Sequence, residues 1–165
     1  MKIALTEMSV NDFKQFISIA TIAYAQNKVK NGDWKLENSL MRSKKAFIAL
    51  LPDGLKTRDH FLKNIEDANG IVGFLWYAIE QEDDERIVFL YEITVFEEYR
   101  NKGYGTKAMK AFMQIAKDLR IERTALHVFG FNSAAIKFYK RLGFKMTDYT
   151  MQHFSRKESL KTYEV

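Results

Sequence analysis

A short glycine-containing loop carries the strongest chemical signal in this sequence. Residues 100–105 read R-N-K-G-Y-G, between a predicted apolar strand and a predicted amphipathic helix. Gly103 and Gly105 let the backbone approach a ligand without a Cβ clash, and the free N–H groups of a helix N-terminus attract an anion. Arg100 and Lys102 add positive charge. The loop therefore predicts a pyrophosphate site, although G-x-G alone is common in turns and the surrounding sequence has to decide.

The segments on either side of this loop extend the pattern. Residues 90–99 read LYEITVFEEY, and residues 132–144 read NSAAIKFYKRLGF. The order V-x-x-E-Y-R-x-x-G-x-G, then N-x-x-A-x-x-x-Y-x-x-x-G-F, resembles the GNAT (Gcn5-related) N-acetyltransferases. A dinucleotide-binding fingerprint is the rival interpretation of the glycines, but it needs a third glycine and an N-terminal βαβ unit. Position 106 is threonine, and about ninety residues precede the loop.

The resemblance implies a fold and a reaction. The fold is α/β, with a twisted, mostly antiparallel mixed sheet of six to seven strands and helices on both faces. The reaction is transfer of an acetyl group from acetyl-CoA to a primary amine of a small molecule or a peptide, with CoA as product and no metal. By the same resemblance, the acetyl-CoA site comprises Thr94, Val95, Arg100, Asn101, Lys102, Gly103, Tyr104, Gly105, Thr106, Asn132 and Tyr139.

Glu92 is the candidate general base. An alkylammonium group with a pKa of about 10.4 is only ~0.1% free base near pH 7.5, so a nearby proton acceptor assists attack on a thioester. Glu92 is an acidic residue in an otherwise apolar strand, where GNAT enzymes often carry a carboxylate. The strand period places it on one face with Leu90 and Thr94, opposite Tyr91, Ile93 and Val95. The alternative is a solvated or ion-paired carboxylate.

Tyr139 is the candidate general acid. A thiolate that leaves into a dry site benefits from a proton donor. Tyr139 matches the tyrosine of the N-x-x-A-x-x-x-Y pattern, which in GNAT enzymes is the usual acid beside the thioester sulfur. The alternative is an ordinary core aromatic residue next to Phe138.

Asn132 and Val95 complete the predicted acetyl-CoA site. Asn132 is a natural N-cap for the helix that follows, and the matching asparagine in GNAT relatives also binds the pantetheine arm. For Val95, the resemblance implies a bulged strand whose backbone polarises the acetyl carbonyl. The strand that ends near Phe129 should then diverge from it and leave a V-shaped slot.

Composition favours one enzyme-sized domain over residues 1–165. The chain has 47% hydrophobic residues, 26 Lys and Arg, and 21 Asp and Glu, which leaves a formal charge of +5. The positive charge is scattered, so an anionic cofactor explains it better than a nucleic acid or a membrane surface. Without cysteine the sequence has no disulfide or thiolate nucleophile, and its three histidines lack metal-ligand spacing. We expect a cytoplasmic protein without a membrane span, in which a homodimer is plausible.

Hydrophobic periodicity and turn signals define the expected elements. Ser9 and Asp12 form a capping-box pattern before a helix that ends at Asn31-Gly32, and Pro52 ends a second helix. We expect a third helix from the glycine loop to Leu119 and a fourth from Asn132 to Gly143. The expected strands cover residues 2–6, 60–66, 71–80, 86–96, 124–129 and 144–154, the last with a bulge at 147–148, and residues from 156 onward fray or form an edge strand.

The acceptor is the part of the function that the sequence leaves open. Residues 31–57 lie where GNAT enzymes place their variable acceptor-binding elements, and the L-L-P-x-G-L-x-T stretch at 50–57 resembles a bacterial subgroup of the family. That resemblance names no substrate. A non-catalytic CoA-binding regulatory module and a transferase for longer acyl-CoA donors remain alternatives to acetyl transfer.

Overall fold

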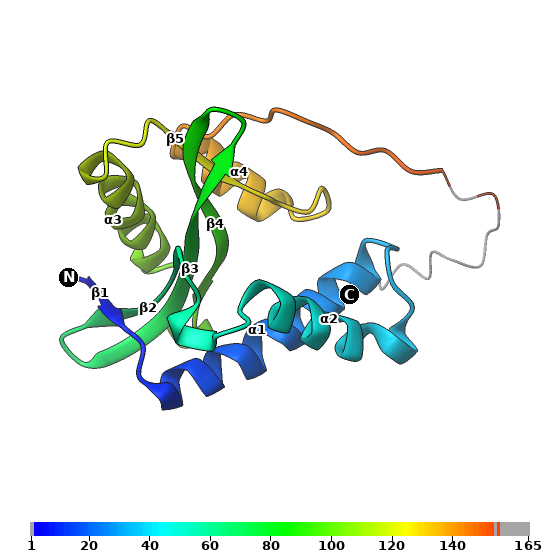
Figure 1. Ribbon diagram of the computed structural model, residues 1–165, viewed down its shortest axis with the longest axis horizontal. Coiled ribbons are helices and arrows are strands. Elements are labelled where there is room, and N and C mark those ends of the chain that lie inside the picture. Colours follow the sequence, from blue (N-terminus) through cyan, green and yellow to red (C-terminus); the bar gives the residue numbers. More distant parts are fainter. Residues whose placement is uncertain (1, 154, 156–165) are drawn as a thin grey trace.

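A twisted five-stranded sheet forms the centre of the structure, a computed structural model that describes residues 2–153 and 155 (Figure 1). The strands lie side by side in chain order, antiparallel from β1 to β4, whereas β5 runs parallel to β4. The strands are β1 (Ala4–Glu7), β2 (His60–Asp67), β3 (Gly70–Glu82), β4 (Glu85–Val95) and β5 (Arg123–Leu126). The prediction of a mostly antiparallel mixed sheet is confirmed, but the predicted six to seven strands are not found, since the described residues form five.

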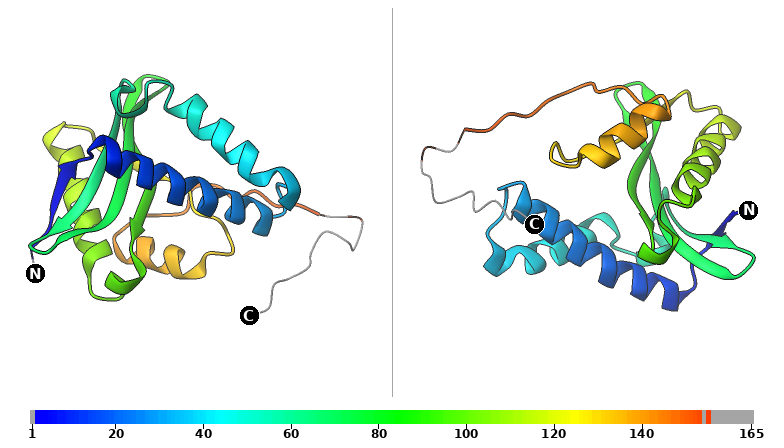
Figure 2. Two further views of the ribbon diagram at one scale, coloured as in Figure 1. Left: turned by 90° about the horizontal axis from the view of Figure 1, so that it is seen from below. Right: turned by 180° about the vertical axis from the view of Figure 1, so that it is seen from behind.

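Helices cover both faces of the sheet, as predicted (Figures 1 and 2). The helices are α1 (Val10–Lys30), α2 (Leu36–Leu50), α3 (Tyr104–Asp118) and α4 (Ser133–Arg141), with single 3₁₀ turns at Gly54–Lys56 and Glu97–Tyr99. Helices α1 and α2 lie on one face, and α3 lies on the other. At the start of α1, the Ser9 Oγ accepts a hydrogen bond from the Asp12 N–H at 3.1 Å, and the Asp12 carboxylate accepts one from the Ser9 N–H at 2.8 Å. The predicted capping box is therefore present.

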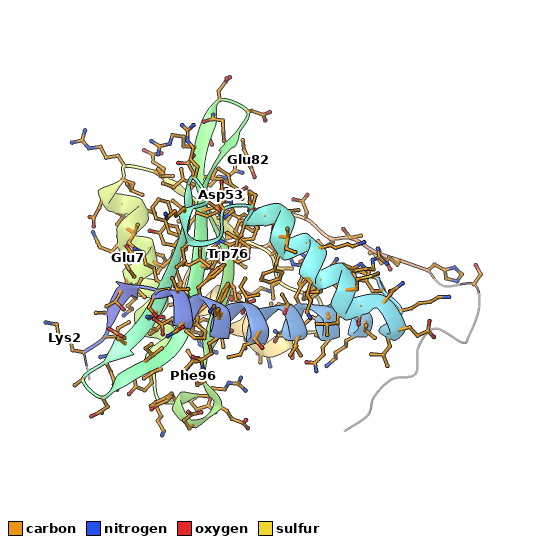
Figure 3. All side chains as sticks on the ribbon, turned by 60° about the horizontal axis from the view of Figure 1, so that its bottom comes forward. Lys2, Glu7, Asp53, Trp76, Glu82 and Phe96 are labelled. Carbon is orange, nitrogen blue, oxygen red and sulfur yellow. The ribbon has the colours of Figure 1, made fainter. Side chains whose placement is uncertain are left out.

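Each face of the sheet has its own core. Under α1 and α2, the ring of Trp76 contacts those of Phe16 and Phe47 at centroid distances of 6.0 and 5.5 Å, and Figure 3 shows Trp76 where β3 meets the two helices. Under α3, the fully buried Phe112 lies edge-on to Tyr77 at 5.7 Å. Leu119, where we expected the third helix to end, is the C-cap residue of α3 and is 41% exposed.

A one-residue bulge interrupts β4. Trp76 pairs with Glu92 while Tyr77 pairs with Leu90, so Tyr91 is the extra residue. The bulge changes which side chains share a face: Tyr91 packs with Trp76 under α1 and α2, whereas Leu90 lies under α3. Glu92 pairs directly with Trp76 and therefore faces α1 and α2. The prediction that Leu90 shares a face with Glu92 and that Tyr91 lies opposite is wrong. The extra residue of the bulge interrupts the regular alternation of side chains between the two faces.

Strands β4 and β5 part midway. Their pairing covers only Ile87–Leu90 and Arg123–Leu126, while β4 continues to Val95. Strand β5 ends three residues before the predicted Phe129, and the chain then passes into the loop that leads to α4. The half of β4 beyond Leu90 thus has no strand partner on this side. The divergence that the sequence predicted is present.

The predicted strand over residues 144–154 is not formed in its described part. After α4, two backbone bonds close the helix end, from the Gly143 N–H to the Lys140 carbonyl and from the Phe144 N–H to the Tyr139 carbonyl. The chain then runs away from the sheet without strand structure (Figure 1), so no bulge exists at 147–148. Its alternating apolar residues have no face to bury: Tyr149 is 76% and Met151 92% exposed. Phe154 and the predicted frayed end from residue 156 lie outside the described residues.

Gly73 of β3 allows the backbone of β4 to approach closely. A Cβ at this position would lie 2.1 Å from the Thr94 carbonyl oxygen and 3.0 Å from the Val95 Cα. Gly73→Ala is therefore expected to destabilise the fold by about 1–3 kcal/mol, as overpacking does, which a thermal melt would register as a drop of roughly 2–4 °C per kcal/mol. Gly130→Ala is the control, because no atom lies within 4 Å of its added Cβ. Equal melting temperatures for the two variants would contradict this reading of Gly73.

Candidate active site

Two neighbouring cavities occupy the space where β4 and β5 part. The first, of about 370 Å³, lies between β4, helices α1 and α2 and the loop before α4. The second, of about 560 Å³, lies between the end of β4, the glycine loop and α4. Ile93, Ala135 and Tyr139 line both cavities. We call the first the acceptor pocket and the second the loop cavity.

The glycine loop leaves the N-terminus of α3 without a side-chain cap. Gly103 is the N-cap residue with φ +88°, a left-handed conformation that favours glycine, and no acidic residue lies in the first turn. Arg100 and Asn101 line the loop cavity, and the Arg100 Nε donates to the Val95 carbonyl oxygen at 3.1 Å. Uncapped N–H groups and a guanidinium at one cavity suit an anion.

Two basic residues of α4 add to this charge, and sequence analysis missed them. Lys137 and Arg141 line the loop cavity from the side opposite the glycine loop, together with Ala134 and Phe138. These positions recur at i, i+3, i+4 and i+7, which places them on one face of a helix. The helical spacing of Lys137 and Arg141 can be read from the sequence, but it indicates an anion site only once α4 is known to face the glycine loop. Three cationic side chains therefore surround the loop cavity.

Six of the eleven predicted acetyl-CoA residues line a cavity, and five line neither. Val95, Arg100, Asn101, Gly105 and Tyr139 line the loop cavity, and Asn132 and Tyr139 line the acceptor pocket. The side chains of the others are engaged elsewhere or line neither cavity: the Tyr104 hydroxyl donates to Asp67, the Lys102 ammonium to the Glu98 carbonyl, and the Thr94 hydroxyl to Glu92. Gly103 is the N-cap residue of α3 and lines neither cavity. Thr106 lines neither cavity.

Glu92 lines the acceptor pocket from the residue after the bulge. Burial raises the pKa of its carboxyl, while hydrogen bonds from the Thr94 hydroxyl and the Ile93 backbone lower it. The Thr94 Oγ1 lies 2.9 Å from Glu92 Oε1. A raised pKa makes a carboxylate a better proton acceptor near neutral pH.

Tyr139 lies on α4 at the junction of the two cavities. Burial, and secondarily the charge of Glu92, raises the pKa of Tyr139 to about 12. Its ring packs edge-on against Phe144 at 5.9 Å, in the turn that closes α4. The hydroxyl therefore keeps its proton at neutral pH, and Glu92 lies near enough for its charge to disfavour the phenolate form of Tyr139. Glu92 and Tyr139 are 47 positions apart in the chain, and the fold brings them to one site.

Asn132 performs the predicted capping role. Its Oδ1 accepts a hydrogen bond from the Ala135 N–H at 3.1 Å and so begins α4. The same residue lines the acceptor pocket. His127 also lines this pocket, and burial lowers its pKa, which keeps the imidazole neutral near pH 7.

Comparison with known proteins decides the family. The family model described as "Acetyltransferase (GNAT) family" matches residues 30–144. YycN, an uncharacterized N-acetyltransferase of Bacillus subtilis (strain 168), is 39% identical over 152 residues, which cover 92% of this chain and 97% of YycN. This chain belongs to the GNAT family. It is an acyltransferase by family, as the sequence pattern predicted.

Two further relatives and one solved structure agree with the GNAT assignment. YdgE, another uncharacterized N-acetyltransferase of Bacillus subtilis, is 28% identical and covers 92% of this chain and 98% of its own. A spermine/spermidine N(1)-acetyltransferase of the same organism is 36% identical over 46% of this chain and 53% of its own. The crystal structure of YycN superimposes with a TM-score of 0.88 at 38% identity, over 93% of this chain and 98% of that chain.

Membrane spans and metal clusters are both absent from the described part of this GNAT chain. None of the helices within residues 2–153 is long and apolar enough to cross a membrane. Over the same residues and 155, no group of three His, Cys, Asp or Glu side chains is placed to hold a metal ion.

Proposed function

We propose that this protein transfers an acetyl group from acetyl-CoA to a primary amine by direct attack in a ternary complex. The observation that carries the proposal is the pair of cavities that meet at Tyr139, with three basic side chains around one and a buried carboxylate in the other. An anionic donor and an amine would thus approach Tyr139 from opposite sides. The spermine/spermidine relative supports an amine as the acceptor.

The residues around the loop cavity fit the donor. Backbone N–H groups at the start of α3, with Arg100, Lys137 and Arg141, would bind its phosphates. Asn132 uses its Oδ1 for the helix cap, so its side-chain N–H group remains to bind the pantetheine arm. Bound acetyl-CoA supplies the thioester that the amine attacks, and it leaves as the free thiol.

The Val95 backbone would polarise the acetyl carbonyl. The Phe96 N–H donates to the Val72 carbonyl of β3, and the Val95 carbonyl accepts from Arg100 on the other side. Backbone groups alternate in direction along a strand, so the Val95 N–H also points away from β3, into the gap that β5 leaves. An N–H fixed at that edge would stabilise negative charge on a carbonyl oxygen.

Two side chains of the site would move the protons. Glu92 would take one proton from the attacking ammonium through a water molecule, and Tyr139 would give one to the leaving sulfur. The C–N bond forms as the C–S bond breaks, and the ammonium loses two protons in all: one to Glu92 before the attack and one after it. The thiol gains one proton from Tyr139, the resulting phenolate takes up the second amine proton, and Glu92 returns its proton to solvent, so one proton is released overall. Without cysteine in the chain, a covalent thioester on the enzyme is excluded, and we favour direct transfer.

Thiol release from acetyl-CoA, followed with a thiol-reactive dye over a panel of amines, tests the proposal. The cysteine-free chain adds no background. Calorimetric titration of acetyl-CoA in parallel separates the alternatives: tight binding without release for any amine would favour a CoA-binding regulatory module. Faster release from succinyl-CoA than from acetyl-CoA, with the same amine, would instead favour a longer acyl donor.

Arg100→Gln is expected to weaken acetyl-CoA binding by about 10- to 100-fold, because a charge-assisted hydrogen bond contributes roughly 1.5–3 kcal/mol. Calorimetric titration with acetyl-CoA measures the change. Arg58→Gln is the matched control, since Arg58 lines neither cavity and its side chain is 94% exposed. Equal dissociation constants for the two variants would remove Arg100 from the donor site.

A further inference from the structure

We propose that the acceptor of this enzyme is a monoamine with an aromatic or other apolar substituent and no carboxylate, of the arylalkylamine type. The inference rests on the proposed acetyl transfer and names the substrate class of the same site. Three features of the acceptor pocket carry it: its aromatic side chains, the paired polar atoms of Trp76 and Tyr91, and a charge pattern with one anion and no cation among the lining residues.

Seven of the eighteen residues that line the pocket are aromatic. They come from five elements and from the loop before α4: Tyr24, Phe47, Trp76, Phe89, Tyr91, Phe129 and Tyr139. Phe89 meets Tyr91 edge-on at 5.0 Å, and Trp76 stacks on Tyr91 at 4.4 Å with an interplanar angle of 16°. Such surfaces bind an apolar or aromatic group through area and ring stacking.

The stacked rings of Trp76 and Tyr91 form an aromatic platform, and the polar atom of each ring is already hydrogen-bonded. The Trp76 Nε1–H donates to His60 Nδ1 at 3.0 Å, and the Tyr91 hydroxyl donates to Glu80 Oε1 at 2.6 Å. These bonds fix the orientation of both rings and leave their apolar surfaces to the cavity. Against these two ring faces, the hydroxyl groups of a ligand such as an aminoglycoside would lose hydration without gaining equivalent partners.

The charge pattern of the pocket selects against acids and against polyamines. Among the described residues that line it, none is lysine or arginine, and Glu92 is the one carboxylate. Lys28 lies near the pocket over the ring of Phe129 at 5.8 Å, but its ammonium is bound to Asp33 at 2.8 Å. A substrate carboxylate would have no counter-ion, and a second ammonium would have no second anion. One ammonium can pair with Glu92.

A matched set of acceptors tests this inference. We would measure kcat/KM for 2-phenylethylamine, L-phenylalanine, L-phenylalaninamide and spermidine by thiol release, and binding of 2-phenylethylamine to the CoA-bound protein by calorimetry. We expect kcat/KM for 2-phenylethylamine to exceed that for L-phenylalanine by at least about 100-fold, because a substrate carboxylate would enter the pocket without a counter-ion. L-Phenylalaninamide keeps the size and removes the charge, so it should recover most of the loss.

A cation added to the pocket should change the preference. Asn27 of α1 lines the pocket, and Asn27→Arg is expected to raise kcat/KM for L-phenylalanine at least about 10-fold through a new charge-assisted pair. Gln26→Arg is the matched control: it adds the same charge one residue away, at an exposed position outside the pocket. Acetyl-CoA titration of both variants verifies that they are folded.

The outcomes separate the inference from the proposed function. Acetylation of L-phenylalanine or spermidine as efficiently as 2-phenylethylamine would overturn the inference and leave acetyl transfer intact. The same holds if 2-phenylethylamine neither binds nor reacts while another amine is acetylated. Absence of thiol release with every amine would overturn the proposed function, and the inference with it.

Discussion

Tyr139→Phe is expected to lower kcat by about 10²- to 10⁴-fold, the usual contribution of a general acid. Only the hydroxyl is lost, and its raised pKa of about 12 means that the wild-type residue carries its proton throughout the pH range of an assay. The ring that packs against Phe144 remains, so the fold should persist. Thiol release at saturating acetyl-CoA and amine measures the loss.

Tyr149→Phe is the control for this experiment, because it removes the same hydroxyl from a side chain that is 76% exposed. Its kcat should equal that of the wild type. If Tyr139→Phe also retained kcat within about threefold, the leaving thiolate would need no acid from the protein and Tyr139 would be a packing residue.

Glu92→Gln is expected to lower kcat/KM by a similar factor, about 10²- to 10⁴-fold, since the amide cannot accept the proton of the ammonium. The pH profile carries the more specific prediction. In the wild type, kcat/KM should fall as the pH is lowered through the raised pKa of Glu92, and this acid limb should be absent from Glu92→Gln. An unchanged acid limb in the variant would assign it to another group.

The same substitution should stabilise the protein at neutral pH. Burial raises the pKa of Glu92 in the folded state, so the folded chain binds a proton more readily than the unfolded chain. This group favours folding below its unfolded pKa, and the contribution is lost as the pH rises through its folded pKa. Glu92→Gln should therefore melt higher than the wild type at pH 7.5, and the difference should shrink in acid.

Glu37→Gln provides the comparison for both measurements, since Glu37 is an exposed glutamate in the first turn of α2. It should leave the pH profile unchanged. It should change the free energy of unfolding by no more than about 0.5 kcal/mol, so its melting temperature should stay close to that of the wild type. A lower melting temperature for Glu92→Gln at neutral pH would show that the carboxylate is paired rather than strained by burial.

Local signals in the sequence predicted most of the helices and strands that hold the site. The capping box at Ser9, the turn at Pro52 and the glycine loop each act through neighbouring residues, and the helices and strands that they delimit are found close to the expected positions. The strand over 144–154 was predicted by the same apolar alternation, but the partner edge that a strand requires is not a local property. Its described part remains extended and exposed.

The walls of the two cavities were less predictable, because they depend on the mutual placement of distant elements. Lys137 and Arg141 gain meaning only when α4 faces the glycine loop. The acceptor pocket joins α1 and α2 to β4 and the loop before α4, and no sequence spacing indicates that contact. The roles of Glu92 and Tyr139 remain predictions, now supported by their shared pocket.

The bulge at Tyr91 couples the shape of the acceptor pocket to the position of the proposed base, Glu92. Because the extra residue turns Tyr91 and Glu92 to the same face, the platform for the substrate and the proposed base are neighbours on one backbone. A substitution that reshapes the platform by moving this strand would move the base as well. Asn27, Ala46 and Leu50 line the same pocket from α1 and α2, which share no strand backbone with Glu92. Redesign of acceptor preference should therefore begin on these helices, where a substitution leaves the backbone of β4 unaltered.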